Sequence, residues 1–244
     1  MRDYKAETAD RIAFIQRLLE EAGAKGIIYG NSGGKDCALS GILCKLACDD
    51  TVGIIMPAGS SQNYGSDKTD ASALAEQFGI ETRIVDLKET FEAIKSAMGK
   101  SAELSDAAAV NIAPRLRMTT LYAIGQSEGR LVAGTGNASE RYMGYFTKWG
   151  DGACDFNPIA DLTVTEIYEF LEYFNAPESI IKKAPSAGLF DGQTDESEMG
   201  VTYRAIDEFI KTGNAAEKDL EIISGYHKVS EHKRAGIPLY GTVK

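Results

Sequence analysis

The chain has 244 residues, of which 43% are hydrophobic and 25% are charged, and its formal net charge is −10. This length and composition predict a globular domain with a sizeable hydrophobic core. The negative charge argues against general nucleic-acid binding, which depends on cations that contact phosphates. There is no apolar run long enough to span a membrane and no signal-peptide segment, so we expect a cytoplasmic protein without membrane contact.

Residue patterns in the first half alternate between helices and short apolar strands. We expect helices at 8–22, 36–48, 67–78, 88–98 and 106–128, and strands at 26–30, 52–56, 82–87 and 131–133. This alternation favours an α/β fold with a doubly wound parallel sheet and helices on both faces. In such sheets, ligands bind at the carboxyl ends of the strands.

The second half is predicted to be mainly helical. Thr163-Val164-Thr165-Glu166 has the pattern of a capping box and begins a helix that reaches about Phe174. Two more helices are expected near 202–212 and 214–227. Residues 184–200 form a long polar stretch without periodicity, which we interpret as a mobile lid that excludes water from a reaction.

The most informative segment is Gly-Asn-Ser-Gly-Gly-Lys-Asp-Cys, from Gly30 to Cys37, between a strand and a helix. Glycines let the backbone approach an anion, and a helix N-terminus offers free N–H groups and a partial positive charge. The spacing differs from the common P-loop, whose first glycine would fall at Tyr29 and whose Mg²⁺-binding hydroxyl would fall at Asp36. The segment resembles the pyrophosphate-binding loop of ATP pyrophosphatases, in which serine usually stands at the position of Cys37.

Three of the four cysteines, Cys37, Cys44 and Cys48, share one face of an expected helix; the fourth is Cys154. Cys44 and Cys48 have a spacing that could hold a metal ion, but buried thiols that pack as small apolar side chains are the favoured interpretation. The sequence contains no CxxC pair, and a cytosolic setting disfavours disulfides.

Four further segments narrow the resemblance. They are residues 111–117, 134–140, 144–152 and 231–234. Together with the loop, they resemble ammonia-dependent NAD synthetases over about residues 10–236. The Phe-Thr-Lys-Trp-Gly-Asp-Gly segment and the late Glu-His-Lys-Arg are the most specific parts. Glutamine-dependent relatives carry an added amidohydrolase domain. Residues 1–244 are therefore expected to form a single NAD synthetase domain, with an ATP-pyrophosphatase core at about 8–160 and a helical part at about 161–244.

This resemblance implies an adenine nucleotide alpha hydrolase-like fold and one reaction. Deamido-NAD (nicotinic acid adenine dinucleotide) reacts with ATP to give an adenylate and pyrophosphate, and ammonia then displaces AMP to give NAD. Mg²⁺ is the implied cofactor, and a homodimer is the implied assembly. Adenylation is needed because a carboxylate on its own has no good leaving group for an amine to displace.

The resemblance also assigns roles to residues at matching positions. ATP is expected to bind Gly30, Asn31, Ser32, Gly33, Gly34, Lys35, Asp36, Cys37, Thr135 and Ser186. Deamido-NAD is expected to bind Arg115, Lys148, Asp155, His232 and Lys233. Asp36 and Glu140 are the expected Mg²⁺ ligands, since Mg²⁺ takes one or two carboxylates together with phosphate oxygens. Asp151 is expected to be the base that accepts a proton from ammonia or ammonium.

A second departure from the family lies at Val164, where relatives usually have a lysine that contacts ATP. We therefore expect a weaker hold on the triphosphate, unless Lys182 or Lys183 supplies the missing charge. Other functions stay open at this point. Another ATP-pyrophosphatase amidase or a tRNA-modifying enzyme would share the loop, although the latter needs a basic surface. A non-catalytic adenine-nucleotide-binding domain would need the loop but not Asp151 or Lys148.

Overall fold

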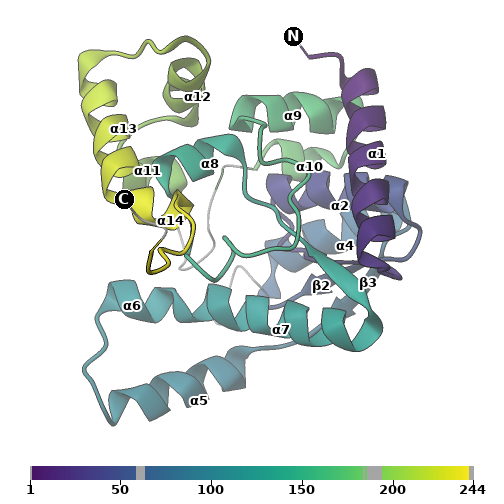
Figure 1. Cartoon of the computed structure of the whole chain (residues 1–244), viewed down its shortest axis with the longest axis horizontal. Coiled ribbons are helices and arrows are strands. Elements are labelled where there is room, and N and C mark those ends of the chain that lie inside the picture. Colours follow the sequence, from purple (N-terminus) through teal and green to yellow (C-terminus); the bar gives the residue numbers. More distant parts are fainter. Residues whose placement is uncertain (1, 59–63, 184, 186–193, 242–244) are drawn as a thin grey trace.

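The computed structural model describes residues 2–58, 64–183, 185 and 194–241. Within these residues, a parallel sheet has the strand order β3-β2-β1-β4 (Figure 1). Its strands are β1 (Gly26–Gly30), β2 (Thr51–Ile55), β3 (Glu81–Ile84) and β4 (Arg130–Ala133). The α/β fold with a parallel sheet, expected from the alternating pattern, is confirmed.

Helices cover both faces of the sheet because alternate residues of β1 point to opposite sides. Ile27 and Tyr29 pack in one cluster with α1 (Tyr4–Ala22), α2 (Lys35–Ala47) and α9 (Val164–Tyr173). Ile28 packs in a second cluster on the other face with α7 (Ile112–Glu128). Helix α4 (Ser66–Phe78) contacts α2, and α5 (Lys88–Gly99) contacts α7. This arrangement leaves the carboxyl ends of the central strands free of covering helices.

The helix expected at 106–128 is two helices, α6 (Asp106–Val110) and α7, which meet at Asn111. Pro114 explains the break, because it lacks the N–H that a continuous helix would direct to the carbonyl of Val110. In the first turn of a new helix, the missing N–H costs nothing. The correction matters for the site, since both helices contribute to its wall.

Tyr29 is fully buried between α2 and β2. A Cβ atom on Gly41 would lie 2.4 Å from the Tyr29 hydroxyl oxygen, so only glycine leaves room for the ring there. Among the described residues, this hydroxyl is a buried polar group without a hydrogen-bond partner. Tyr29 therefore supports the start of the glycine-rich loop by packing rather than by hydrogen bonding.

The remaining helices of the described chain follow β4. They are α8 (Ala138–Met143), α9, α10 (Glu178–Ile181), α11 (Asp195–Met199), α12 (Tyr203–Thr212), α13 (Glu217–Val229) and α14 (Glu231–Arg234). Side chains of α8, α9, α11, α12 and α13 form a third hydrophobic cluster, which includes Met143, Val164 and Ile223. Residues 195–199 were expected in an irregular stretch, but they form α11, whose N-cap is Thr194. No helix in the described part of the chain could cross a membrane.

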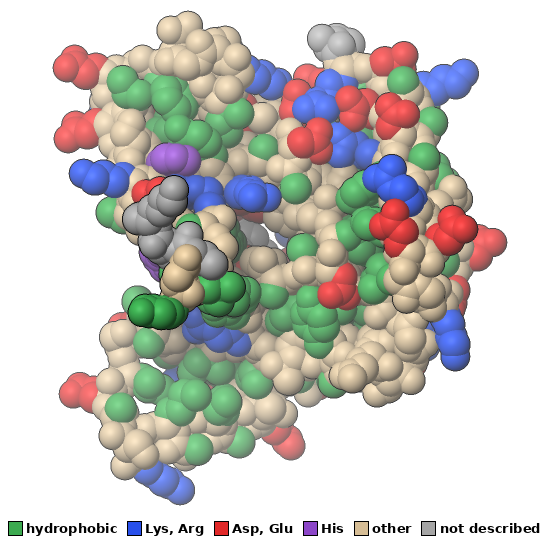
Figure 2. All heavy atoms as spheres, in the orientation of Figure 1, with side chains coloured by type: hydrophobic (Ala, Val, Ile, Leu, Met, Phe, Trp, Pro, Cys, Tyr) green, Lys and Arg blue, Asp and Glu red, His purple; other side chains and the backbone are tan. Residues whose placement is uncertain are grey.

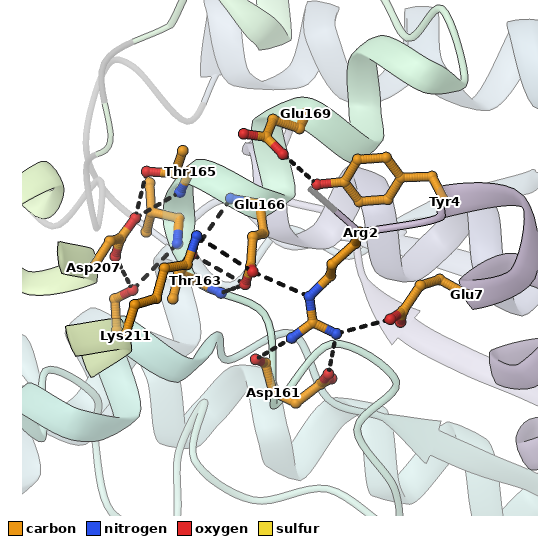
Figure 3. Close-up of polar contacts among 12 residues, drawn as sticks. Arg2, Tyr4, Glu7, Asp161, Thr163, Thr165, Glu166, Glu169, Asp207 and Lys211 are labelled. Atoms are coloured by element: carbon orange, nitrogen blue, oxygen red, sulfur yellow. Dashed lines mark hydrogen bonds and ion pairs between the residues drawn. The ribbon is translucent and has the colours of Figure 1, made fainter. Parts of the chain in front are cut away.

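An ion-pair network joins the start of the chain to α9 (Figure 3). Arg2 contacts Glu7, Asp161 and Glu166 at N–O distances of 3.0–3.1 Å. Arg11 also pairs with Asp161, at 2.7 Å. Glu166 completes the capping box that the sequence predicted at Thr163. The network therefore fixes the beginning of α9 against α1.

Candidate active site

A cavity of about 630 Å³ lies at the carboxyl ends of β1, β2 and β4. The glycine-rich loop, α7, the turn before Asp151 and the end of α13 contribute to its wall. In Figure 2, this face of the molecule is hollowed between the region of α12 and α13 and the region of α5 and α6. The position agrees with the expectation that ligands bind at the carboxyl edge of a parallel sheet.

The glycine-rich loop has the geometry of an anion site. Its last glycine, Gly34, is the N-cap of α2 and makes no side-chain cap, so N–H groups at the helix start can face a ligand. Asn31 holds the loop: its Nδ2 donates to Ala71 O at 3.1 Å and its Oδ1 accepts from Gly33 N at 3.3 Å. Gly33 has φ +73°, and a Cβ there would lie 2.2 Å from the carbonyl oxygen of Asp67.

Cys37 is buried at the foot of the loop and contributes to the cavity wall. Its sulfur lies 3.2 Å from Ser32 Oγ and 3.1 Å from the carbonyl oxygen of Gly34. Burial raises the pKa of the thiol, so it stays protonated at neutral pH. Cys37 therefore acts here as a neutral side chain that braces Ser32.

Two carboxylates meet beside the loop. Lys35 Nζ lies 2.6 Å from Asp36 Oδ2 and 3.9 Å from Glu140 Oε1, and Asn137 Nδ2 donates to Asp36 Oδ1 at 2.9 Å. Burial, together with the charge of Asp36, raises the pKa of Glu140 well above its ordinary value. Burial of Lys35 opposes its charge, but these two carboxylates raise its pKa. The ammonium group of Lys35 therefore balances negative charge at Asp36 and Glu140.

This arrangement fits a Mg²⁺ site. Among the described residues, no three His, Cys, Asp or Glu side chains converge as a metal cluster. Asp36 and Glu140 could supply two protein oxygens, with nucleotide phosphates and water completing the shell. Mg²⁺ is commonly held in this way, by few carboxylates and its substrate. Asp195, whose charge also acts on Glu140, contributes to the same wall.

Asp151 lies in a turn that follows α8. Thr147 N donates to Asp151 Oδ1 at 3.0 Å, and Thr147 Oγ1 donates to Asn111 at the junction of α6 and α7. Protein surrounds the carboxylate, and this burial raises its pKa, although the residue keeps exposed surface toward the cavity. A raised pKa suits a proton acceptor that must work near neutral pH.

The late basic segment closes one side of the cavity. Lys233 Nζ donates to the carbonyl oxygens of Gly144 and Phe146 at 2.7 and 2.8 Å. Lys148 Nζ donates to His232 O at 2.7 Å. These bonds hold α14 against the turn that carries Asp151.

Of the site residues expected from the sequence, most contribute to the cavity. They are Gly30, Asn31, Ser32, Gly34, Lys35, Asp36, Cys37, Thr135, Glu140, Asp151 and Lys233. Gly33 does not contribute to the wall, but its positive φ shapes the glycine-rich loop. Ser186 lies outside the described residues, as does most of the expected lid.

Four residues expected to bind deamido-NAD lie outside the cavity wall: Arg115, Lys148, Asp155 and His232. Asp155 accepts hydrogen bonds from Val132 N at 2.8 Å and from the hydroxyl of Tyr122 at 3.2 Å, so it ties β4 to its neighbours. The binding roles of these four residues stay predictions.

Two charged residues with no role expected from the sequence, Arg117 and Asp67, also contribute to the wall. Arg117 stands two positions after the expected Arg115. Residues two apart on a helix point to nearly opposite sides, which explains why only one of the two arginines faces the cavity. Helical phase was therefore the signal that could have identified Arg117.

Val164 does not contribute to the cavity wall, although relatives were expected to have an ATP-contacting lysine at this position. It is 3% exposed and packs in the third hydrophobic cluster. Lys183 faces the cavity instead, and its Nζ lies 2.8 Å from both Asp67 Oδ1 and Asp70 Oδ2. Lys182 pairs with Glu178 on the exposed side of α10. Of the two lysines considered as replacements, Lys183 is therefore the one beside the glycine-rich loop.

Comparison with known proteins decides the family. Residues 7–237 match the family model described as NAD synthase. This chain belongs to the NAD synthase family. The NH3-dependent NAD+ synthetase of Carboxydothermus hydrogenoformans is 41% identical over 235 residues, which cover 95% of this chain and 96% of that protein.

Solved structures of the NAD synthase family agree. The NMN synthetase of Francisella tularensis is 36% identical with a TM-score of 0.93, over 99% of this chain and 100% of that one. The NH3-dependent NAD synthetase of Campylobacter jejuni is 28% identical with a TM-score of 0.80, over 98% and 99%. The resemblance inferred from the sequence motifs is confirmed, and with it a ligase that uses ATP in NAD biosynthesis.

Proposed function

We propose that this chain converts deamido-NAD to NAD with ATP and ammonia, releasing AMP and pyrophosphate. The observation that carries the proposal is one cavity that joins three parts of the expected chemistry. These are the glycine-rich loop that ends at Gly34, the carboxylate pair of Asp36 and Glu140, and the carboxylate of Asp151. Family membership over residues 7–237 makes this combination specific to NAD synthesis.

In the first step, an oxygen of the nicotinate carboxylate attacks the α-phosphorus of ATP, and the bond from that phosphorus to pyrophosphate breaks. The loop N–H groups at Gly34 and the start of α2 would hold the departing phosphates. Thr135, which also contributes to the cavity wall, would contact the nucleotide. Holding both anions in line could give effective molarities on the order of 10⁵ M or more.

In the second step, ammonia adds to the carbonyl carbon of the adenylate, and the bond from that carbon to the AMP oxygen breaks. The nitrogen loses a proton, which Asp151 accepts. The bond from Thr147 N orients this carboxylate, and its raised pKa makes it a better base than an aspartate with an ordinary pKa. Lys233 and its contacts to the Gly144–Phe146 turn keep this part of the wall in place.

Mg²⁺ is the cofactor that the carboxylate pair fits, and when bound it would neutralise the charge of the phosphates. Asp36 and Glu140 would hold it, with Asn137 orienting Asp36. We also propose a cytoplasmic homodimer, by analogy with the family. Light scattering on the purified protein would test the dimer, and a monomer at assay concentrations would reject it.

A second candidate, amidation of a nicotinate mononucleotide, rests on the fold comparison. The TM-score is higher with the NMN synthetase of Francisella tularensis than with the NAD synthetase of Campylobacter jejuni, 0.93 against 0.80. The deciding assay gives the protein ATP, Mg²⁺ and ammonium with either deamido-NAD or nicotinate mononucleotide. A higher kcat/KM for deamido-NAD supports the first function, and the reverse supports the second. Neither amide product from a folded sample would reject both, and would reopen the amidase and nucleotide-sensor alternatives.

A further inference from the structure

The turn that carries Asp151 contains a strained backbone position. Trp149 has φ +63°, a left-handed conformation that is rare for a bulky residue. Among the described residues other than glycine, only Asn175 also has a positive φ. Trp149 is 58% exposed, so burial of its own ring does not hold this conformation. A strained turn persists only where contacts around it fix its shape, and here other residues must supply them.

A side chain at the junction of α6 and α7 supplies one of these contacts. Thr147, at the start of the turn, is buried, and its hydroxyl donates to Asn111 Oδ1 at 2.5 Å. Asn111 Nδ2 donates in turn to the carbonyl oxygen of Ala107, in α6, at 2.7 Å. The oxygen and the nitrogen of the Asn111 side chain are thus both engaged within the protein, and they link α6 to the turn.

Close packing against the first turn of α7 supplies the rest. A Cβ atom on Gly150 would lie 3.0 Å from Pro114 Cβ and 2.9 Å from Thr147 Cγ2, so a glycine is needed for the turn to approach α7 this closely. Arg115 Nη2 also donates to the carbonyl oxygen of Lys148 at 3.2 Å. The turn therefore rests on the point where the helical segment is broken.

Thr147 connects this anchor to the proposed base. Its backbone N–H donates to Asp151 Oδ1 at 3.0 Å, and its carbonyl oxygen accepts from Gly150 N at 2.9 Å and Gly152 N at 3.2 Å. One residue thus fixes both the shape of the turn and the orientation of the carboxylate. Asn111, Thr147 and Asp151 all contribute to the cavity wall. A shift of about 1 Å in a positioned group can lower a rate roughly 100-fold.

We propose that Asn111 and the hydroxyl of Thr147 are positioning residues, which hold Asp151 where it can accept the proton that ammonia loses. The proposal rests on the proposed amidation of deamido-NAD, with Asp151 as its base. Neither residue is assigned a contact with the reacting atoms, and each acts through the turn. Because adenylation comes before the step that uses the base, the pair acts on amide formation and leaves adenylation unchanged.

Two measurements separate the steps. Exchange of labelled pyrophosphate into ATP, dependent on deamido-NAD and measured without ammonium, reports adenylation, and NAD formation reports the whole reaction. Thr147→Val keeps the shape of the side chain and the backbone bond to Asp151 but loses the hydroxyl. It is expected to lower kcat for NAD formation roughly 10- to 100-fold, with exchange at the wild-type rate. Asn111→Ala should behave in the same way, whereas Thr147→Ser, which keeps the hydroxyl, should stay near the wild type.

Thr120→Val is the matched control, because the Thr120 hydroxyl donates to the carbonyl oxygen of Leu116 within α7, at 2.9 Å. It should change neither measurement. A double-mutant cycle then tests whether Thr147 acts through the base. In an Asp151→Asn background, Thr147→Val is expected to cause no further fall in kcat, since two residues that act through one group are not additive.

A purely structural role predicts other results. Thr147→Val would then lower exchange and NAD formation together with the melting temperature, or its effect would multiply with that of Asp151→Asn, and either outcome overturns the proposal. A wild-type kcat in Thr147→Val or in Asn111→Ala overturns it as well. A wild-type kcat in Asp151→Asn removes the base and this proposal with it. A folded wild type that forms no NAD rejects the proposed function itself, which is a separate result.

Discussion

The carboxylate of Asp207, on α12, accepts a hydrogen bond from the hydroxyl of Ser139, the residue before Glu140. The same carboxylate accepts bonds from the backbone N–H and the hydroxyl of Thr165, at 2.8 and 2.6 Å (Figure 3). Asp207 is 3% exposed, so these bonds are shielded from water. One buried side chain thus joins α12 to α8 and α9. Through Ser139, it holds the turn of α8 that carries Glu140.

The first prediction concerns this link. Asp207→Asn is expected to lower the free energy of unfolding by about 1–3 kcal/mol, because a buried charged acceptor with three donors is lost. It should also raise the Mg²⁺ concentration needed for half-maximal activity, because Glu140 is held less firmly. Glu169→Gln is the matched control, since Glu169 bonds to Tyr4 at the edge of the same network. Identical Mg²⁺ curves for Asp207→Asn and the wild type would show that Asp207 does not act through Glu140.

The second prediction tests Asp151. Asp151→Asn is expected to lower kcat for NAD formation roughly 10²- to 10⁴-fold, the range for loss of a general base. Pyrophosphate release in the presence of hydroxylamine should be affected much less, because hydroxylamine is a neutral nucleophile at pH 7 and needs less help in losing a proton. Pyrophosphate and NAD are measured in parallel. An equal loss with both nucleophiles would assign Asp151 to the adenylation step or to folding.

The third prediction concerns pH and the α1 network. Burial opposes the charge of Asp161, but the hydrogen bond and charge of Arg11 and the charge of Arg2 lower the pKa of Asp161 below its ordinary 3.8. A carboxylate with a lower pKa in the folded state stabilises the protein above its unfolded pKa, and this contribution is lost as the pH falls through the folded pKa.

Melting temperatures of the wild type and Arg11→Gln are therefore compared from pH 6 down to the acid limit of folding. The wild type should be more stable at pH 6, and the difference should shrink below about pH 4. Other titrating groups are common to both proteins and cancel in the comparison. A difference that stays constant with pH would contradict the linkage between Arg11 and Asp161.

The fourth prediction uses the buried hydroxyl of Tyr29. Tyr29→Phe is expected to increase the free energy of unfolding by about 1–3 kcal/mol, because it removes a buried polar group that has no partner. Tyr122→Phe is the control, because the Tyr122 hydroxyl donates to Asp155 and its loss should not stabilise the protein. Urea denaturation measures both. If Tyr29→Phe is less stable than the wild type, the Tyr29 hydroxyl does have a hydrogen-bond partner and the prediction is wrong.

The fifth prediction replaces an expectation drawn from the sequence. A lysine at position 164 was expected to lower the KM for ATP, but Val164 packs among apolar side chains, so Val164→Lys should cost at least about 3 kcal/mol of stability. Lys183→Ala should instead raise the KM for ATP roughly 10-fold, through loss of a charge beside the phosphates. The exposed neighbour, in Lys182→Ala, should leave that KM unchanged. An improved KM in a stable Val164→Lys protein would restore the original expectation.

The sequence predicted the parts of this protein that depend on local pattern. Strand–turn–helix order located the loop at Gly34, and the capping box at Thr163 placed the start of α9. The alternation of strand and helix patterns along the first half also predicted helices on both faces. These features depend on residues close in the chain, so a local pattern is enough to find them.

The arrangement of the site could not be predicted in the same way. Which arginine of α7 faces the cavity depends on the phase of that helix, whereas Arg115 was assigned from the family resemblance, which carries no information on helical phase. Similarly, the missing lysine at Val164 was inferred from a family pattern, while the side chain's surroundings come from α11, α12 and α13. Such facts depend on packing between segments far apart in the sequence.

The contacts of Lys233 have a consequence for the order in which the site is assembled during synthesis. The glycine-rich loop is synthesised before Lys233, the lysine that braces the turn before Asp151. The four strands of the sheet are likewise synthesised before Lys233. A growing chain therefore contains the glycine-rich loop before it contains all the residues that complete the cavity wall near Asp151.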